Sequence, residues 1–270
     1  MSLSLTDSFE VYHANSAFGS STAKLAVKSL MLCHDRMTGI DTIPNHPHFQ
    51  IGSIIHLAVL EPEKFKAQVV SEGPINDKTG KPYGRDTQKF SDWQAANPDK
   101  MVVEPWIHTL LKRMPAEVKE LLKTGVAEAS IYQTAACGLP VKCRPDHLDG
   151  TVITHLKTCV DVDRLERDIE KFEYWFASSW YNTVMLLETG KKHSSQFVFA
   201  EKKPPFRWRI VKKIDADYAM YADEVVAKTI GKLQVASVSG DWADHDEIEV
   251  MVSRPDWMGD EIDEDEEVAE

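Results

Sequence analysis

The pattern of apolar and polar positions predicts five long helices. In several stretches apolar residues recur every three to four positions, as on the buried face of an amphipathic helix. One stretch is apolar almost throughout, and we expect a buried helix that ends before Glu61-Pro62. Ser20, Ser21 or Thr22 can cap the first helix, and Gly39 is its expected end. The helices are predicted at residues 20–37, 49–60, 106–123, 160–190 and 216–235.

Strand-like alternation of apolar and polar residues is confined to the second half of the chain. The dipeptide Asp149-Gly150 separates two alternating runs and predicts a two-residue hairpin loop. Pro204-Pro205 separates two further runs and predicts a second hairpin. Strands are therefore predicted at residues 127–134, 141–148, 151–156, 195–200 and 206–214.

Residues 73–100 are rich in Gly, Pro, Asn, Asp and Lys, and they predict a long surface loop with a short helix near residues 87–95. Loops of this length inside a compact domain tend to be functional or mobile. The basic residues of the loop have two interpretations of about equal weight: they contact a phosphate backbone, or they belong to an ordinary solvated loop. They are Lys78, Lys81, Arg85 and Lys89.

The charge of the chain is acidic and unevenly distributed. The formal net charge is −12, from 31 Lys and Arg against 43 Asp and Glu, which argues against a protein that coats DNA through a basic surface. Residues 260–270 contain eight acids and no base. We expect residues 259–270 to form a disordered, solvating tail, although such a tail could also occupy a basic channel or contact a partner.

The cysteines and the hydropathy indicate an intracellular protein. The four cysteines form no CxxC pair, and the N-terminus does not resemble a secretory signal, so free thiols in a reducing cytoplasm are expected. No apolar run approaches the roughly 18 residues that a membrane span requires. We therefore expect a cytoplasmic protein without a membrane partner.

Polar side chains converge at the first predicted hairpin. Asp146 lies near the end of its first strand, and His155 and Lys157 share one face of the second, because strand side chains alternate with a period of two. A Pro-Asp at the end of one strand and a Lys on the next resembles the active-site hairpin of the PD-(D/E)xK nucleases. In that superfamily the residue two positions before the lysine is normally an acid, whereas this chain has His155.

Further segments extend the resemblance to the exodeoxyribonuclease VIII family, which belongs to the RecB-type nucleases. They occur in the expected order over most of the chain. They are Gly52-Ser53-Ile54-Ile55-His56 followed by Leu60-Glu61-Pro62, Arg144-Pro145-Asp146, His155-Leu156-Lys157-Thr158, Ser239-Gly240-Asp241-Trp242 and Arg254-Pro255-Asp256-Trp257.

The resemblance implies an α/β fold, in which helices flank a central mixed sheet within one domain at residues 1–258. It also implies a metal-dependent 5′→3′ double-strand DNA exonuclease of the phage or prophage recombination type, which uses Mg²⁺. The implied partners are double-stranded DNA ends, a single-strand annealing recombinase and further copies of the chain in a ring. His56, Glu128, Asp146 and His155 are then the expected metal ligands, with Asp146, His155 and Lys157 as the catalytic set.

Two departures from the active pattern leave the activity open. An imidazole at position 155 suits Mn²⁺ or Zn²⁺ better than Mg²⁺, which prefers oxygen ligands. The family also carries a glutamine four residues before a tyrosine, and if Tyr181 is that tyrosine the position holds Ala177. Three alternatives follow: a displaced acid such as Glu128 or Asp149 keeps the enzyme active, the enzyme uses Mn²⁺, or the chain is an inactive DNA- or protein-binding module.

The second predicted hairpin is the most basic part of the chain. Its basic residues could line a DNA channel, although edge-strand lysines are also a common guard against edge-to-edge pairing. The residues predicted to contact DNA are Lys202, Lys203, Arg207 and Arg209.

Overall fold

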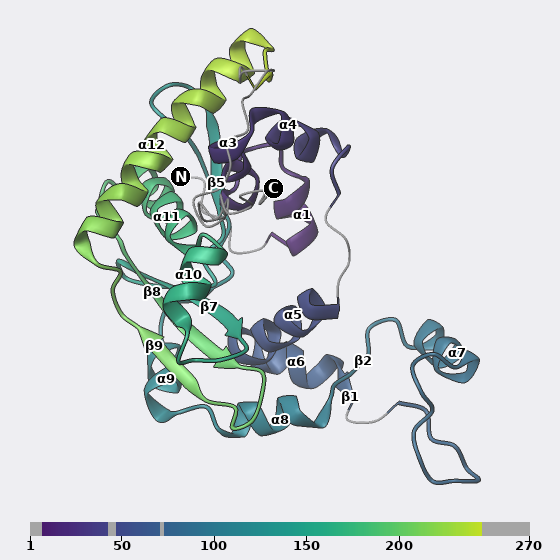
Figure 1. The fold of residues 1–270 in the computed structure, drawn as a ribbon. Helices are drawn as coiled ribbons and strands as arrows, with labels where there is room; N and C mark the ends of the chain where they lie inside the picture. The colour runs from purple at the N-terminus through teal and green to yellow at the C-terminus, as the bar shows by residue number, and fades with distance from the viewer. Residues whose placement is uncertain (1–6, 43–46, 71–72, 245–270) are drawn as a thin grey trace, which may run out of the picture.

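A mixed five-stranded sheet forms the centre of the protein in a computed structural model that describes residues 7–42, 47–70 and 73–244 (Figure 1). The strand order is β3-β6-β7-β8-β9. Only β7 and β8 are parallel, and the other neighbours are antiparallel. These strands are β3 (Val126–Ala127), β6 (His147–Asp149), β7 (Val152–Cys159), β8 (Ser194–Glu201) and β9 (Trp208–Val211).

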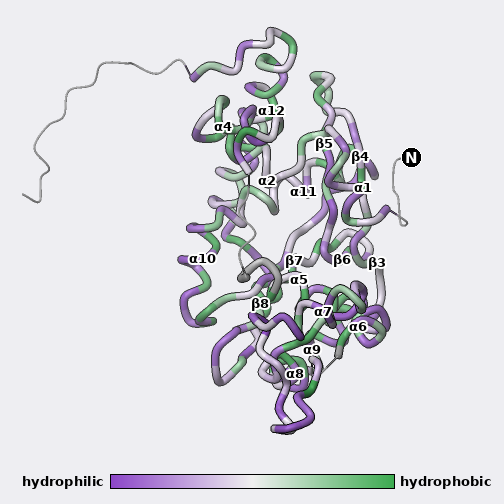
Figure 2. Tube along the Cα trace, turned by 90° about the vertical axis from the view of Figure 1, so that its right-hand side faces the viewer, coloured by the Kyte–Doolittle hydropathy of each residue, from purple (hydrophilic) through white to green (hydrophobic). Residues whose placement is uncertain are grey.

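Helices cover both faces of this sheet, which confirms the predicted fold class. On β8, Phe197 and Phe199 join one core cluster, while the intervening Val198 joins the other. The first cluster packs against α10 (Leu165–Lys171), α11 (Tyr174–Thr189) and α12 (Ala216–Ser239). The second packs against α5 (Pro47–Leu60), α6 (Pro62–Gln68), α8 (Pro105–Lys112) and α9 (Ala116–Leu121). Hydrophilic residues run along the outer side of α10 (Figure 2).

The remaining elements lie beside this central sheet. β4 (Ile131–Thr134) and β5 (Pro140–Cys143) form an antiparallel pair. The N-terminal region contributes α1 (Phe9–Ala14), α2 (Ser20–Ala23), α3 (Leu25–Lys28) and α4 (Leu30–Thr38). The short parallel pair of β1 (Val69–Val70) and β2 (Met101–Val102) brackets the predicted surface loop, which projects from the body and carries α7 (Gln88–Ala96) (Figure 1).

Several predicted elements are interrupted for identifiable reasons. The first predicted helix is three short helices, in which Gly19 precedes α2 and the Ser29 side chain caps α4 by accepting from the Leu32 N–H. Gly39 ends α4 in the left-handed conformation, as predicted. The helix predicted at residues 106–123 breaks before Pro115, because proline cannot donate a helical hydrogen bond.

The first hairpin also differs in detail from its prediction. Asp149 pairs with Val152, so the two loop residues are Gly150 and Thr151 rather than Asp149 and Gly150. The strand predicted at residues 141–148 is divided into β5 and β6 by Arg144-Pro145-Asp146. The second hairpin has its turn at Pro204-Pro205, as predicted.

Two sequence predictions fall outside the described residues. These are the Arg254-Pro255-Asp256-Trp257 segment and the acidic tail at residues 259–270. Within the described part of the chain, no helix combines the length and the apolar character that crossing a membrane requires.

Candidate metal centre

Asp146 is held in place by the neighbouring strand, although it lies between β5 and β6. Its Oδ2 accepts the backbone N–H of Leu156 at 2.7 Å and contacts Lys157 Nζ at 3.2 Å. Both contacts use Oδ2, so the other oxygen, Oδ1, is left to face His56. Burial alone would raise the pKa of this carboxyl, but Lys157 and His56 hold the pKa below its ordinary value. Asp146 is therefore ionised at neutral pH.

Glu128 turns the chain between β3 and β4. Its φ of 56° lies in the left-handed region, and its backbone N–H donates to the carbonyl of Asp146 at 3.2 Å. Its Oε2 accepts from Arg144 Nε at 2.8 Å, and Arg144 also donates to Ser130 Oγ. The turn and the arginine thus direct Oε1 to the same place as Asp146 Oδ1.

His56 approaches these two oxygens from α5, across the surface of the sheet. Its Nδ1 lies 3.9 Å from Glu128 Oε1 and 3.8 Å from Asp146 Oδ1. The adjacent Ile55 is fully buried in the core and anchors the helix at this point. Each carboxylate therefore uses one oxygen for contacts within the protein and presents the other to a point that His56 shares.

These three side chains fit a divalent cation. Their ligand atoms all lie within 4.8 Å of one another. Two oxygens at about 2.1 Å from one Mg²⁺ ion lie roughly 3 Å apart at right angles and roughly 4 Å apart on opposite sides. The observed separations between His56 and the carboxylates are close to that range. One imidazole and two carboxylates suit Mn²⁺ or Zn²⁺ at least as well as Mg²⁺.

His155 stands apart from this group, although it is a predicted ligand. Its side chain is 2% exposed, stacks against Phe197 with ring centroids 5.1 Å apart, and contacts the tilted ring of Tyr181. Burial, and after it the charge of Lys157, lower the pKa of His155 to about 3, so the ring is neutral at physiological pH. Within the described residues its Nε2 is buried without a hydrogen-bond partner. The structure thus gathers His56, Glu128, Asp146 and Lys157 and leaves His155 packed among aromatic rings.

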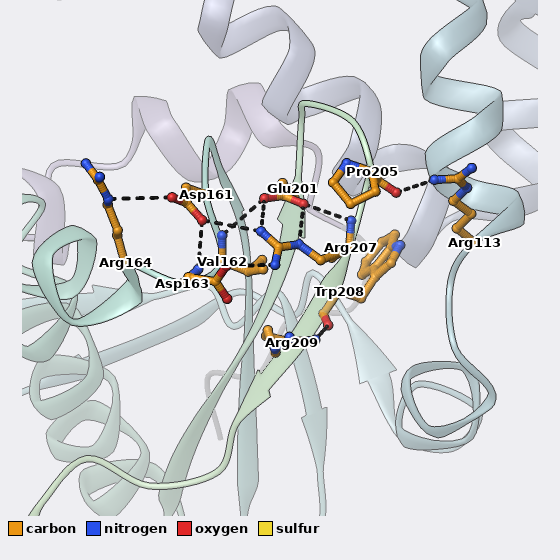
Figure 3. A network of polar contacts seen from close by, with 10 residues as sticks. All are labelled: Arg113, Asp161, Val162, Asp163, Arg164, Glu201, Pro205, Arg207, Trp208 and Arg209. Atoms are coloured by element: carbon orange, nitrogen blue, oxygen red, sulfur yellow. Dashed lines mark hydrogen bonds and ion pairs between the residues drawn. The ribbon is translucent and has the colours of Figure 1, made fainter.

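The residues predicted to bind DNA differ in their surroundings, and Figure 3 shows those of Arg207 and Arg209. The Arg207 guanidinium contacts Glu201, Asp161 and Asp163 at 2.8, 3.4 and 2.7 Å. These three carboxylates already accept from the guanidinium N–H groups of Arg207, which favours a structural role for Arg207 over contact with DNA. Lys203 and Arg209 are exposed, Lys202 is half-buried, and DNA contact by these three stays a prediction.

Two contacts that support the metal centre, both made by Arg144, were not predicted from the sequence. Arg144, within the Arg-Pro-Asp motif, fixes Glu128, and Ser130 in turn receives a hydrogen bond from Arg144. The motif itself was the available signal for Arg144. Asp149, considered as a displaced acid, is exposed on the hairpin and accepts from Thr124 Oγ1 at 2.7 Å, outside the three-ligand group.

Comparisons with known proteins support the same superfamily. A crystal structure from Eubacterium rectale, of a protein described as a "putative exonuclease", aligns with a TM-score of 0.53 and 13% sequence identity, over 94% of this chain and 98% of that one. At that identity the likeness shows the fold alone. No curated protein matches the chain. The resemblance to exodeoxyribonuclease VIII in particular stays an expectation. Residues 21–250 match the model of a PDDEXK-like domain of unknown function, DUF3799, and the chain belongs to that family.

Proposed function

We propose that this protein is a metal-dependent DNA nuclease that binds one divalent cation at His56, Glu128 and Asp146. One observation carries the proposal. Two carboxylates and an imidazole from three separate segments present their remaining ligand atoms to one point, and within the described residues no protein cation fills it. Nuclease-fold proteins use such a point to hold a cation against a phosphodiester.

The chain's own residues have distinct roles in this proposal. A bound cation would lower the pKa of a water molecule and stabilise charge on the phosphate. Lys157 keeps a positive charge beside the cluster, because Asp146 holds its Nζ at 3.2 Å, and this charge favours an anionic phosphodiester. Arg144 fixes the orientation of Glu128. His56 supplies a nitrogen ligand, which favours a single Mn²⁺ ion over Mg²⁺.

The finer details of the proposal rest on the resemblance to exodeoxyribonuclease VIII. We propose double-stranded DNA ends as the substrate, 5′→3′ as the direction, a ring of several copies as the assembly and a single-strand annealing recombinase as the partner. Digestion of a duplex labelled at either its 5′ or its 3′ end distinguishes the two directions.

A second candidate function is DNA binding without cleavage. It is favoured by one observation: the position that normally holds the catalytic acid carries a neutral, buried imidazole packed on Phe197. Such a chain would keep the nuclease fold and the affinity for DNA while lacking one anionic ligand.

One assay separates the two candidates. Linear duplex DNA is incubated with the protein and either Mn²⁺ or Mg²⁺, and released nucleotides are measured. For the nuclease we expect faster release with Mn²⁺ and a loss of about 100-fold or more in Asp146→Asn, since even indirect support of a metal ligand is worth 10- to 100-fold. We expect His155→Asp to raise the rate with Mg²⁺, because the PD-(D/E)xK nucleases that the chain resembles normally carry an acid at this position. His13→Asn removes an exposed histidine of α1 and should leave the rate unchanged.

The outcomes have different consequences. An inert natural protein beside an active His155→Asp variant would favour the non-cutting candidate. Inert proteins throughout, with no Mn²⁺ binding by isothermal titration calorimetry, would overturn the metal centre itself.

A further inference from the structure

Two lysine pairs lie together at one end of the central sheet. Lys191-Lys192 precede β8 with only His193 between, and Lys212-Lys213 directly follow β9. Because β8 and β9 are antiparallel, the beginning of β8 lies near the end of β9, and the pairs share one end of the hairpin. All four lysines are exposed, and none forms an ion pair within the described residues. Four uncompensated positive charges therefore gather there in a chain that is acidic as a whole.

A cleft of about 280 Å³ opens beside these lysines, between α11, α12 and the ends of the two strands. Lys212, Lys213 and His193 lie on its border. Side chains of the two helices form its walls. The helix residues that line it include Trp175, Ser178, Ser179, Asn182 and Asp223.

One buried hydrogen-bond donor of a cleft residue lacks a protein partner. The indole N–H of Trp175, 5% exposed, makes no hydrogen bond within the described part of the chain. Ser178, which is 7% exposed, also lines the cleft. Buried polar groups are nearly always hydrogen-bonded, so the unpaired indole N–H calls for an acceptor from outside.

The neighbouring polar groups are already engaged. Ser179 donates to Asp223 at 2.5 Å, and Ser195 donates to Asn182 at 3.0 Å. Asp223 brings one negative charge to the cleft, which opposes an anion, but Lys212 and Lys213 on its border outnumber it. Positive charge at the rim together with a free indole donor in the wall suits a ligand with several acceptor oxygens and negative charge, and a phosphate group has both.

The cleft is separate from the metal centre. Along β7 and β8, Val152 pairs with Ser194 at the cleft end, whereas Lys157 pairs with Phe199 near the metal centre. Five residues of strand separate these positions, which corresponds to roughly 17 Å. A phosphate in the cleft would therefore belong to a nucleotide some distance from any phosphate at Asp146.

We propose that the cleft bordered by Lys212 and Lys213 is a phosphate-binding site that holds the DNA backbone away from the metal centre. DNA as the source of the phosphate rests on the proposed function, whereas the chemistry of the cleft does not. The site lies at the opposite end of the β8–β9 hairpin from Lys202 and Lys203, the lysines predicted to touch DNA. It is therefore an additional contact that would extend the DNA-binding surface.

The test measures binding without cleavage. A fluorescently labelled duplex is titrated with protein in the presence of a chelator, over a range of salt concentrations, and anisotropy is recorded. In the variant Lys212→Gln/Lys213→Gln we expect weaker binding and a dependence of log affinity on log salt that is shallower by roughly 1 per lysine removed. The matched control, Lys228→Gln/Lys232→Gln, removes the same charge from exposed positions of α12 and should keep the natural slope.

Inorganic phosphate provides a second arm that does not depend on DNA. Phosphate should raise the melting temperature of the natural protein more than chloride at equal ionic strength, and this difference should fall in Lys212→Gln/Lys213→Gln and in Ser178→Ala. A phosphate effect without any DNA binding would support the cleft and contradict the DNA-binding part of the proposed function. Equal losses in the cleft and control variants, or no phosphate effect beside normal DNA binding, would overturn the inference.

Discussion

The metal centre and the Arg207 network are both clusters of acidic side chains near the sheet, and they differ in how their charges are compensated. In the network, three carboxylates surround one guanidinium, and Glu201 is 2% exposed with Arg207 contacts at 2.8 and 2.9 Å (Figure 3). In the metal centre, Glu128 and Asp146 each have one oxygen paired and one oxygen facing His56. The first cluster is complete without a ligand, and the second is arranged around a position that a ligand can occupy.

The difference separates stability from function. A buried ion pair that loses one partner leaves an uncompensated charge, which is strongly destabilising. In the metal centre Arg144 and Lys157 each pair one carboxylate oxygen, and the two oxygens that face His56 have no such partner, so removal of one carboxylate should cost metal binding more than stability. We therefore expect substitutions in the network to change folding and substitutions in the metal centre to change metal binding.

The largest expected effect is that of Arg207→Met. It leaves Glu201 buried without its cation, and we expect it to lower the free energy of unfolding more than any other single substitution in either cluster. Asp146→Asn, which keeps an oxygen for the Leu156 N–H, should change the free energy of unfolding by less than about 1 kcal/mol. Urea denaturation followed by circular dichroism measures both.

A double substitution tests the cause of that loss. Arg207→Met combined with Glu201→Gln leaves no buried charge, so it should be more stable than Arg207→Met alone. The alternative outcome is a double variant whose loss in the free energy of unfolding equals the sum of the losses of the two single variants. In that case Arg207 would stabilise the fold through packing, and the network would not differ from the metal centre in the way that its charges are compensated.

A smaller effect is expected from pH. The hydrogen bonds from Arg207 lower the pKa of Glu201 to about 2, from an ordinary value of 4.5. A carboxyl whose pKa is depressed in the folded state contributes stability above its unfolded pKa, and this contribution is lost as the pH falls through the folded pKa. Between pH 5 and pH 2 the stability gap between the natural protein and Glu201→Gln should therefore narrow, by up to about 3 kcal/mol.

Thermal unfolding at several pH values measures this gap. Asp163→Asn is the control, because that side chain is 63% exposed and should give a small gap at every pH. A stability gap for Glu201→Gln that stays constant from pH 5 to pH 2 would contradict the claim that the ionised Glu201 carboxylate stabilises the fold through Arg207.

The contrast also explains which features could be predicted from the sequence. Asp146, Lys157 and His56 belong to local motifs with recognisable spacing, and the structure brings them together. The Arg207 network joins residues from β8, from the segment just before β9 and from the segment after β7, and their pairing depends on strand register, which no local pattern reveals. His155 was expected among the ligands because strand alternation places it on the face of Lys157, but alternation does not report the aromatic rings of Phe197 and Tyr181 that enclose it.

The smallest expected effect is the difference in stability between two substitutions of Glu128, and it reports the backbone strain at that position. Its φ of 56° is unfavourable for most residues with a Cβ atom, and Asn tolerates this region better than Ala. Glu128→Asn and Glu128→Ala both remove the carboxylate that faces His56, so both should weaken Mn²⁺ binding measured by calorimetry. The Asn variant should nevertheless be more stable to urea than the Ala variant, by about 0.5–1 kcal/mol. Equal stability of the two variants would mean that the turn between β3 and β4 relaxes out of the left-handed region once the contact with Arg144 is gone.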